Sequence, residues 1–217
     1  MLVGHNPGFE DLLLHLADPT PEIPGDGKLM PTATIAQLSM PDDWKSLKQG
    51  AAKLLQLMRG SDLPKKFPFP SPNGEEQRDR PAYYYTQSSV IPYRISDKGM
   101  EVLIVRSSGD KHWVVPKGIA DPGLSLQESA AKEAWEEAGV QGRVHEVAIG
   151  NYSYPKWGAV CSVAVYPMDV SRELPQAEWE ERHRGREWVS AQKAAESLNQ
   201  AELAPFIKAL EKQLTGN

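Results

Sequence analysis

The fold is decided by the stretch Gly118-Ile-Ala-Asp-Pro-Gly-Leu-Ser-Leu-Gln-Glu-Ser-Ala-Ala-Lys-Glu133-Ala-Trp-Glu136-Glu137-Ala-Gly139-Val140. Ser125 followed by Glu128 is a capping box, so a helix is expected to begin at Leu126. Gly139 can adopt the left-handed conformation that ends a helix. The stretch therefore predicts a glycine-bounded turn followed by a helix over residues 126–138.

The predicted helix gathers its carboxylates on one face. Glu133, Glu136 and Glu137 fall within an arc of roughly 100°, because each residue advances the helix by about 100°. A neighbouring arc carries the residues that would face a core, Ala130, Ala131, Ala134, Trp135 and Ala138. Three carboxylates this close repel one another, and Mg²⁺, which binds oxygen ligands together with substrate phosphates, gives a reason for the arrangement. A solvated acidic helix face is the alternative, because such spacings are common in exposed helices.

The same stretch resembles the box of the Nudix hydrolase family: Gly, five residues, Glu, seven residues, then Arg-Glu-U-x-Glu-Glu-x-Gly-U, where U is a bulky aliphatic residue. The matching positions are Gly118, Glu133, Glu136, Glu137, Gly139 and Val140.

Three positions depart from the box. Leu124 replaces the first Glu, Lys132 replaces the Arg, and Ala134 is smaller than the usual aliphatic residue. In the family the Arg orients the helix carboxylates, and a lysine keeps the charge but loses the planar fork. Asp121 is a candidate to stand in partly for the missing Glu.

The resemblance covers residues 82–212. Residues 102–105, 113–118 and 186–189 are similar to the diphosphoinositol polyphosphate and diadenosine polyphosphate branch of the family. It implies an α/β/α sandwich with a mixed sheet, and a hydrolase that uses Mg²⁺, with Mn²⁺ as an alternative. The bond cleaved would join two phosphates in a nucleoside polyphosphate, a dinucleoside polyphosphate or an inositol pyrophosphate. A weakened Nudix module that binds a nucleotide as a sensor is the alternative from another functional class.

The resemblance also implies roles for individual residues. Glu133, Glu136, Glu137 and the backbone carbonyl of Lys117 would hold the metal. Glu137 is the expected general base, with Glu180 and Glu181 as the next candidates, and Glu181 is the candidate fourth carboxylate. Gly118, Lys132 and Gly139 would shape the box.

Basic residues near the expected strand ends are candidates for binding phosphate: Arg106, Lys111, Lys156, Arg182, Arg184 and Arg186. The last three alternate along the chain, so a strand there would point all three the same way. Taken singly, each also fits a solvated surface charge, and Arg186 beside Glu187 and Trp188 also fits a structural ion pair.

The chain divides by composition into residues 1–63, a proline-rich and charged linker at 64–81, and residues 82–217. We expect the linker to be extended. In the last unit, strands are expected over 83–93, 101–106, 143–149 and 158–168, with helices over 191–197 and 202–214.

The first unit is expected to be an incomplete α/β fragment, with a helix over 9–16 and a strand over 31–38. Its motif Val3-Gly-His5-Asn6-Pro7 resembles the second half of a histidine phosphatase of the phosphohistidine phosphatase type. The family's nucleophile lies in an Arg-His-Gly motif that this sequence lacks, so no phosphatase activity is expected. Either the domain has decayed, or the true start lies upstream in a bifunctional phosphatase–Nudix protein. His5 is either a leftover residue or a residual anion-binding group.

Composition narrows the class of protein. The net charge of −5 argues against a nucleic-acid-binding protein, which would carry a basic stripe. No apolar run approaches the roughly 20 residues that span a bilayer, and residues 1–5 do not resemble a signal peptide. The single cysteine, Cys161, suits a reducing cytoplasm. We therefore expect a cytoplasmic protein whose partner is a small phosphorylated molecule, with its oligomeric state open.

Overall fold

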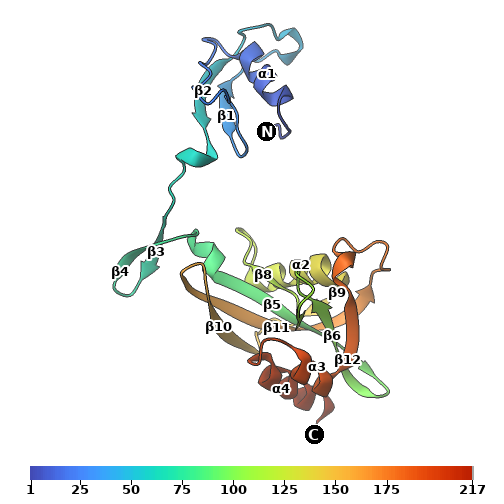
Figure 1. Cartoon of the computed structure of the whole chain (residues 1–217). Helices are drawn as coiled ribbons and strands as arrows, with labels where there is room; N and C mark the ends of the chain where they lie inside the picture. Colours follow the sequence, from blue (N-terminus) through green and yellow to red (C-terminus); the bar gives the residue numbers. More distant parts are fainter. Residues whose placement is uncertain (217) are drawn as a thin grey trace. The chain divides into compact units, whose positions relative to one another are not determined.

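The computed structural model describes residues 1–216, and the chain divides into two compact units, Met1–Lys65 and Lys66–Asn217 (Figure 1). The first is called unit 1 below and the second unit 2.

Unit 2 is built on a mixed sheet. Its main strands run in the order β10 (Gly150–Lys156), β11 (Ala159–Glu173), β5 (Thr86–Ser96), β6 (Gly99–Arg106) and β12 (Arg186–Ser190). Shorter strands extend it, with β7 (Trp113–Val114) on β6, β8 (Lys117–Ile119) on β5 and β9 (Val140–Val144) on β11. The β11–β5 pair is parallel and the other pairs are antiparallel.

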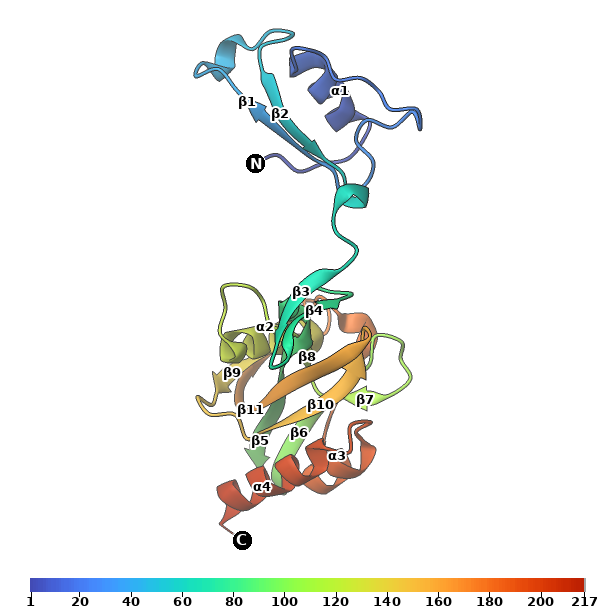
Figure 2. The ribbon, with the colours of Figure 1, turned by 90° about the vertical axis from the view of Figure 1, so that its left-hand side faces the viewer.

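Helices cover both faces of this sheet (Figures 1 and 2). Helix α2 (Leu126–Ala138) packs on one face, whereas α3 (Ala191–Ser197) and α4 (Leu203–Thr215) pack on the other. Because successive strand residues point to opposite faces, Val102 and Ile104 of β6 join the α3–α4 core while Leu103 joins the α2 core. The α/β/α sandwich with a mixed sheet is confirmed.

The predicted linker is not extended throughout. Within residues 64–81, β3 (Phe67–Ser71) and β4 (Gly74–Arg78) form a hairpin that belongs to unit 2. The prolines that suggested a linker are tolerated because β3 belongs to a two-stranded hairpin, where a missing N–H can face solvent. The hairpin is anchored by the Arg78 guanidinium, which lies 3.2 Å from the centre of the Phe69 ring and 5.0 Å from that of Tyr85.

Three strand expectations differ from the structure. Residues Ala82–Tyr85 form a 3₁₀ turn, so the strand expected from 83 begins at Thr86. The strand expected over 143–149 lies earlier, as β9. Residues 150–156 form a further strand, β10, which is not among the strands expected from the sequence; left-handed Trp157 (φ 51°) and Gly158 (φ 71°) make the tight turn that returns the chain as β11.

Unit 1 is a small α/β arrangement. Helix α1 (Gly8–Leu16) packs on the hairpin of β1 (Ile35–Ser39) and β2 (Lys53–Met58), with 3₁₀ turns at Trp44–Ser46 and Gly60–Asp62. Its core centres on Leu13, Ala17 and Leu29.

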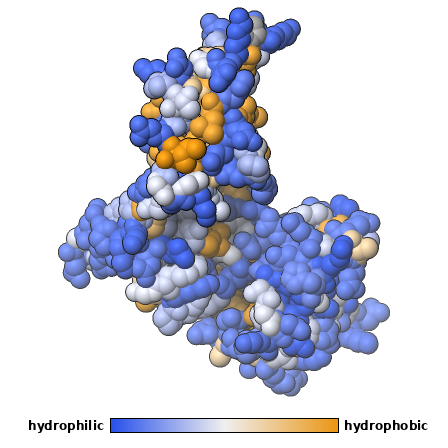
Figure 3. Space-filling view, turned by 45° about the horizontal axis from the view of Figure 1, so that its top comes forward, coloured by the Kyte–Doolittle hydropathy of each residue, from blue (hydrophilic) through white to orange (hydrophobic). Residues whose placement is uncertain are grey.

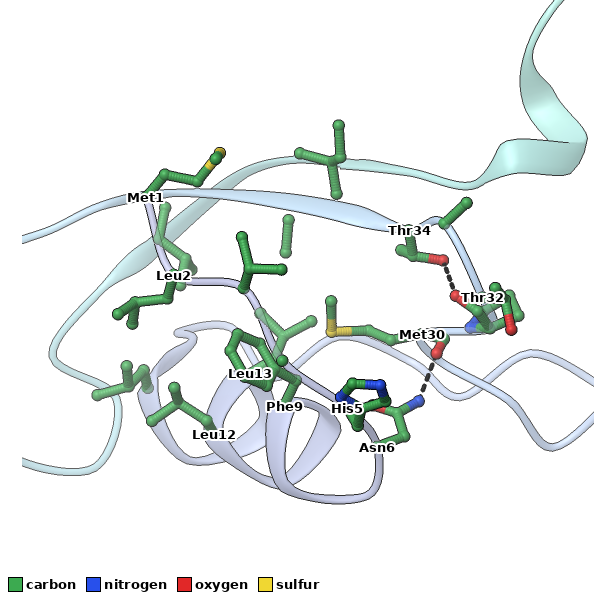
Figure 4. A pocket seen from close by; sticks show the side chains of 18 of the residues that line it. Met1, Leu2, His5, Asn6, Phe9, Leu12, Leu13, Met30, Thr32 and Thr34 are labelled. Atoms are coloured by element: carbon green, nitrogen blue, oxygen red, sulfur yellow. Dashed lines mark hydrogen bonds between the residues drawn. The ribbon is translucent and has the colours of Figure 1, made fainter. Parts of the chain in front are cut away.

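An apolar groove of about 870 Å³ opens between α1, β1 and the first six residues of unit 1. Figure 3 shows apolar residues on the surface of this unit, and Figure 4 shows His5 and Asn6 beside Met30 in the groove. The Asn6 amide donates to the Met30 carbonyl, which holds the turn before α1.

Within residues 1–216, none of the helices combines the length and the apolar character needed to cross a membrane.

Arg186 ties the sheet to the end of α2. Its guanidinium donates to the carbonyls of Ala138 (2.6 Å) and Leu174, and pairs with Glu173 at 2.9 Å. Ala138 is the last residue of α2, and Leu174 directly follows the end of β11. Buried carbonyls at such positions need hydrogen-bond donors.

We expect Arg186→Met to lower the free energy of unfolding by about 2–3 kcal/mol, because it removes charge-assisted hydrogen bonds from half-buried carbonyls. Urea unfolding followed by circular dichroism measures the change. Arg143→Met, at an exposed position of β9, is the control and should change stability by less than about 0.5 kcal/mol. Equal effects in the two variants would contradict this anchoring role.

Candidate active site

Helix α2 begins and ends as the sequence predicts. Ser125 accepts from the backbone N–H of Glu128, whose side chain accepts from the backbone N–H of Ser125. Gly139 ends the helix in the left-handed conformation (φ 62°). A Cβ at Gly139 would also meet the Trp179 ring and the Arg186 guanidinium, so both backbone and packing require glycine there.

The Glu133 carboxylate lies directly against the backbone of Gly118. A Cβ at Gly118 would overlap the carboxylate, so this glycine lets α2 approach β8 closely. Burial, followed by the negative charges of Glu137 and Glu136, raises the pKa of Glu133 from 4.5 to about 7. A cation bound beside the Glu133 carboxyl would therefore stabilise its ionised form.

Glu137 is held from two sides. One of its oxygens accepts from the backbone N–H of Lys117 at 2.9 Å, and the other pairs with Arg184 at 2.8 Å. Burial raises the pKa of this carboxyl, while the Lys117 N–H and Arg184 act in the opposite direction.

Glu136 lies further out on the helix. Its carboxylate is 3.7 Å from the Lys132 ammonium, which also pairs with Asp121 at 2.5 Å. Lys132 therefore forms its ion pairs with Asp121 and Glu136, on the exposed side of the box. Asp121, the candidate to stand in partly for the missing box glutamate, is thus paired with Lys132.

The backbone of Lys117 faces α2. On both sides of Lys117 the chain is hydrogen-bonded to β5. The Val90 N–H donates to the Pro116 carbonyl (3.1 Å), and the Ala120 N–H donates to the Thr86 carbonyl (3.0 Å). Because backbone groups alternate along a strand, the N–H and carbonyl of Lys117 point away from β5, and the N–H reaches Glu137. This orientation is consistent with the carbonyl role expected from the sequence.

The Lys117 side chain has a second environment. Its ammonium donates to the Gln87 amide oxygen and to the Tyr154 hydroxyl, both at 2.8 Å. Burial lowers the pKa of Lys117. Only the backbone of Lys117 was assigned a role from the sequence, and the pairing of Gln87 with a distant lysine carries no sequence signal.

The segment after β11 closes over the C-terminal end of α2. Trp179 is almost fully buried, and its indole N–H donates to the Glu136 carbonyl at 2.9 Å. The 3₁₀ turn Arg182–Arg184 follows, and Arg184 there pairs with both Glu137 and Glu181. The sequence motif around Trp179 showed acidic residues but gave no sign of this anchor.

The three alternating arginines do not lie on one strand. Arg182 and Arg184 belong to the 3₁₀ turn, Gly185 follows with a positive φ of 71°, and only Arg186 belongs to β12. Arg182 is exposed and donates to the Ala177 carbonyl, whereas the Arg186 guanidinium is occupied by structural partners.

The remaining basic candidates lie at loop and strand ends. Arg106 ends β6, stacks 4.1 Å from the Trp113 ring and lies 3.6 Å from Asp110. Lys111 is exposed on the β6–β7 loop. Lys156 ends β10, with its ammonium 4.3 Å from the Trp157 ring. Arg106 and Arg184 lie beside each other, since an Arg184 nitrogen is 3.5 Å from the Arg106 carbonyl.

The donor set fits a hard divalent cation. Three carboxylates share one helical face, and two of them, Glu133 and Glu137, are desolvated, which raises the pKa of each. Such a pair of carboxylates is stabilised by a cation with oxygen ligands. Within residues 1–216, no three acidic, His or Cys side chains already converge on one point, because Glu137 faces Arg184 and Glu136 faces Lys132.

Comparison with known families gives one match: the NUDIX domain, over residues 85–210. Among curated proteins, Nudix hydrolase 16, mitochondrial, of Arabidopsis thaliana is 34% identical over 111 residues, which are 47% of this chain and 60% of that protein. Nudix hydrolase 12, mitochondrial, of the same plant is 29% identical over 163 residues, or 62% and 79% of the two chains. The chain thus spans less than two thirds of the first of these relatives.

Two further similarities concern a different named activity. The bis(5'-nucleosyl)-tetraphosphatase [asymmetrical] of Sus scrofa is 25% identical over 49% of this chain and 75% of that protein. Among solved structures, the Ap4A hydrolase of C. elegans superimposes with a TM-score of 0.50 at 22% identity, covering 59% of this chain and 97% of that one. At this identity the structural match establishes the fold alone.

The raised pKa of Glu133 makes the stability of the metal-free protein depend on pH. The folded pKa lies above the unfolded value of 4.5, so the folded state binds the proton more tightly. Stability is then full below about pH 4.5 and falls as the pH rises through about 7. In chelator, we expect the free energy of unfolding to drop by about 1–2 kcal/mol between pH 5 and pH 8, a value reduced for partial screening by water.

Thermal or urea unfolding at a series of pH values measures this slope. Glu133→Gln should flatten it, whereas Glu187→Gln, at an exposed carboxylate paired with Lys193, should leave it in place. A slope that persists in Glu133→Gln would contradict the assignment.

Proposed function

The chain belongs to the Nudix family, and from this premise we propose that unit 2 is a Mg²⁺-dependent hydrolase of phosphate–phosphate bonds. The observation that supports the proposal is the packing of α2 against the box loop. The Glu133 carboxylate lies against Gly118, and the Glu137 carboxylate accepts a hydrogen bond from the Lys117 N–H. Two desolvated carboxyls with raised pKa values therefore lie beside the backbone of the box loop. A divalent cation that also binds phosphate oxygens would neutralise the charge of these two carboxylates.

The metal ligands we propose are Glu133, Glu136, Glu137 and the Lys117 carbonyl, with Glu181 as a fourth carboxylate. Mg²⁺ held there, or Mn²⁺ in its place, would neutralise phosphate charge and lower the pKa of an attacking water. Glu137 is the proposed proton acceptor, because burial raises its pKa while the Lys117 N–H donates to one carboxylate oxygen and Arg184 forms an ion pair with the other. Glu180 is exposed and has no contact that favours it for this role.

Cations around the box would bind the substrate phosphates. Arg106 and Lys111 lie on the side of the β6–β7 loop, whereas Lys156 lies at the end of β10 beside Tyr154. Arg184, on the 3₁₀ turn, is already paired with Glu137 and Glu181. We keep Arg182 as a peripheral candidate and leave Arg186 out, because its guanidinium is committed to Ala138 and Leu174.

The proposed substrate class is the dinucleoside polyphosphates, followed by inositol pyrophosphates and nucleoside triphosphates. The similarity to a protein named bis(5'-nucleosyl)-tetraphosphatase supports the first of these. Cations that come from several separate elements favour a substrate with a chain of phosphates.

The second candidate function is a nucleotide sensor with weak turnover. It is favoured by exposed Leu124 at the position of the first box glutamate, and by Lys132 at the position of the box arginine. A sensor would bind the nucleotide without turnover, and its affinity would not depend on Glu137.

For unit 1 we propose no phosphatase activity. His5 lines the apolar groove beside Asn6, and the sequence holds no Arg-His-Gly motif to supply a nucleophile. The likeness to a histidine phosphatase, a bifunctional arrangement and the cytoplasmic location stay predictions. The plant relatives are named mitochondrial, which is a statement about those proteins.

Product analysis on the purified chain tests the proposal. The panel holds diadenosine tetraphosphate, an inositol pyrophosphate, nucleoside triphosphates and p-nitrophenyl phosphate, each with Mg²⁺ and with chelator. We expect turnover of a phosphate–phosphate bond that chelator abolishes and that Glu137→Gln reduces by roughly 100-fold or more. Glu187→Gln is the matched carboxylate control, with full activity expected, and p-nitrophenyl phosphate should not be hydrolysed.

Nucleotide binding without turnover of any substrate, at an affinity that Glu137→Gln leaves unchanged, would replace the hydrolase by the sensor. Hydrolysis of p-nitrophenyl phosphate that His5→Ala abolishes would overturn the proposal for unit 1.

A further inference from the structure

The guanidinium of Arg184 joins two carboxylates that come from different elements. Its Nη2 lies 2.8 Å from Glu137 on α2, and its Nε pairs with Glu181, at the start of the 3₁₀ turn. One planar fork thus spans a box glutamate and a loop glutamate. Without it, the two negative charges would face each other at short range, and like charges repel.

Arg184 is much more deeply buried than Lys132, the other cation beside the box glutamates. The Arg184 side chain is 10% exposed and its partner Glu137 is 14% exposed, whereas Lys132 is 45% exposed. An ion pair that water reaches freely contributes little, whereas one that is largely buried is screened less and holds its partners more strongly. Arg184 is therefore the cation that controls the inner carboxylate of the box.

The turn that carries Arg184 is itself fixed at both ends. On one side, Trp179 donates to the Glu136 carbonyl, and a Cβ at Gly139 would meet its ring. On the other side, the Arg106 N–H donates to the Gly185 carbonyl at 3.2 Å. These two anchors are contacts within the protein, and they hold the Arg184 guanidinium beside Glu137.

Lys132 occupies the box position whose arginine is expected to orient the helix carboxylates. Its ammonium is turned to Asp121 and Glu136, so that position no longer serves Glu137. A lysine could not grip two carboxylates in one plane in any case, because it is a point charge.

We propose that Arg184 is the positioning residue of this site: it takes over the orienting role at Glu137 and brings Glu181 into the carboxylate cluster. This inference rests on the proposed function of unit 2. In it, Arg184 holds the plane of the Glu137 carboxylate together with the Lys117 N–H, and neutralises the repulsion that would drive Glu181 away. Glu181 then stands within one guanidinium width of the metal-binding face of α2.

The test is a double-mutant cycle between Arg184→Gln and Glu181→Gln, read first by Mg²⁺ binding to the free protein in calorimetry. If Arg184 brings Glu181 to the site, each single variant weakens Mg²⁺ binding about three- to tenfold, and the double variant is no weaker than Arg184→Gln alone. Lys193→Gln, which removes the exposed pair with Glu187, is the matched control and leaves Mg²⁺ binding unchanged. Additive losses, or unchanged or tighter binding in Arg184→Gln, would overturn the proposal.

Kinetics separate positioning from direct binding of phosphate. We expect Arg184→Gln to lower kcat at least tenfold with KM changed less than twofold, since a positioning residue acts through Glu137 and Glu181. A KM raised tenfold or more with kcat retained would instead make Arg184 a phosphate clamp and contradict the inference.

Arg184→Lys guards against loss of folding in the glutamine variant. It keeps the charge but cannot span both carboxylates, so we expect it to melt near the wild type and still lose Mg²⁺ affinity and kcat. Full function in Arg184→Lys would show that charge alone suffices and would overturn the proposal. If the wild-type protein binds Mg²⁺ but hydrolyses no substrate, the proposed function fails while the Mg²⁺ cycle still decides the role of Arg184.

Discussion

The close approach of α2 to the backbone of the box loop is the constraint on which the site depends. Gly118 has no side chain, so the Glu133 carboxylate can lie against it, and the Lys117 N–H reaches Glu137 one turn further along. Small alanines at 130, 134 and 138, on the neighbouring arc of the helix, let it lie close to the sheet. Both carboxylates are thereby desolvated, and this is what raises their pKa values.

Burying carboxylates in this way creates a charge imbalance that the helix cannot correct itself. Lys132 of α2 itself pairs with the outer carboxylates Asp121 and Glu136. The cation at Glu137 comes from outside the helix: it is Arg184, from the turn after β11. Trp179 and Arg186 have the related task of closing the C-terminal end of α2. The segment 179–186 therefore completes the site as well as the fold, although it lies some 40 residues beyond the box.

The elements predicted well are those whose signals are local. The Ser125–Glu128 capping box and Gly139 fixed both ends of α2, because capping depends on residues within one turn. Burial of β6 on both faces could be anticipated from its continuous apolar run, and its residues alternate between the two cores of the sandwich. The three box glutamates were expected on one face of α2, and the structure has them there.

The features that the sequence could not predict depend on partners far apart along the chain. Arg182, Arg184 and Arg186 look equivalent as an alternating series, yet they lie in three different environments. Arg182 is exposed, Arg184 pairs with Glu137, and Arg186 donates to the Ala138 carbonyl. The same holds for Lys117, whose ammonium meets Gln87 and Tyr154 from two other strands. Charge pattern identifies which residues can bind an anion, but only the tertiary fold decides whether that anion is a carboxylate of the protein or a phosphate. In this site the protein's own carboxylates already occupy its most buried arginine, so substrate binding is left to cations nearer the surface.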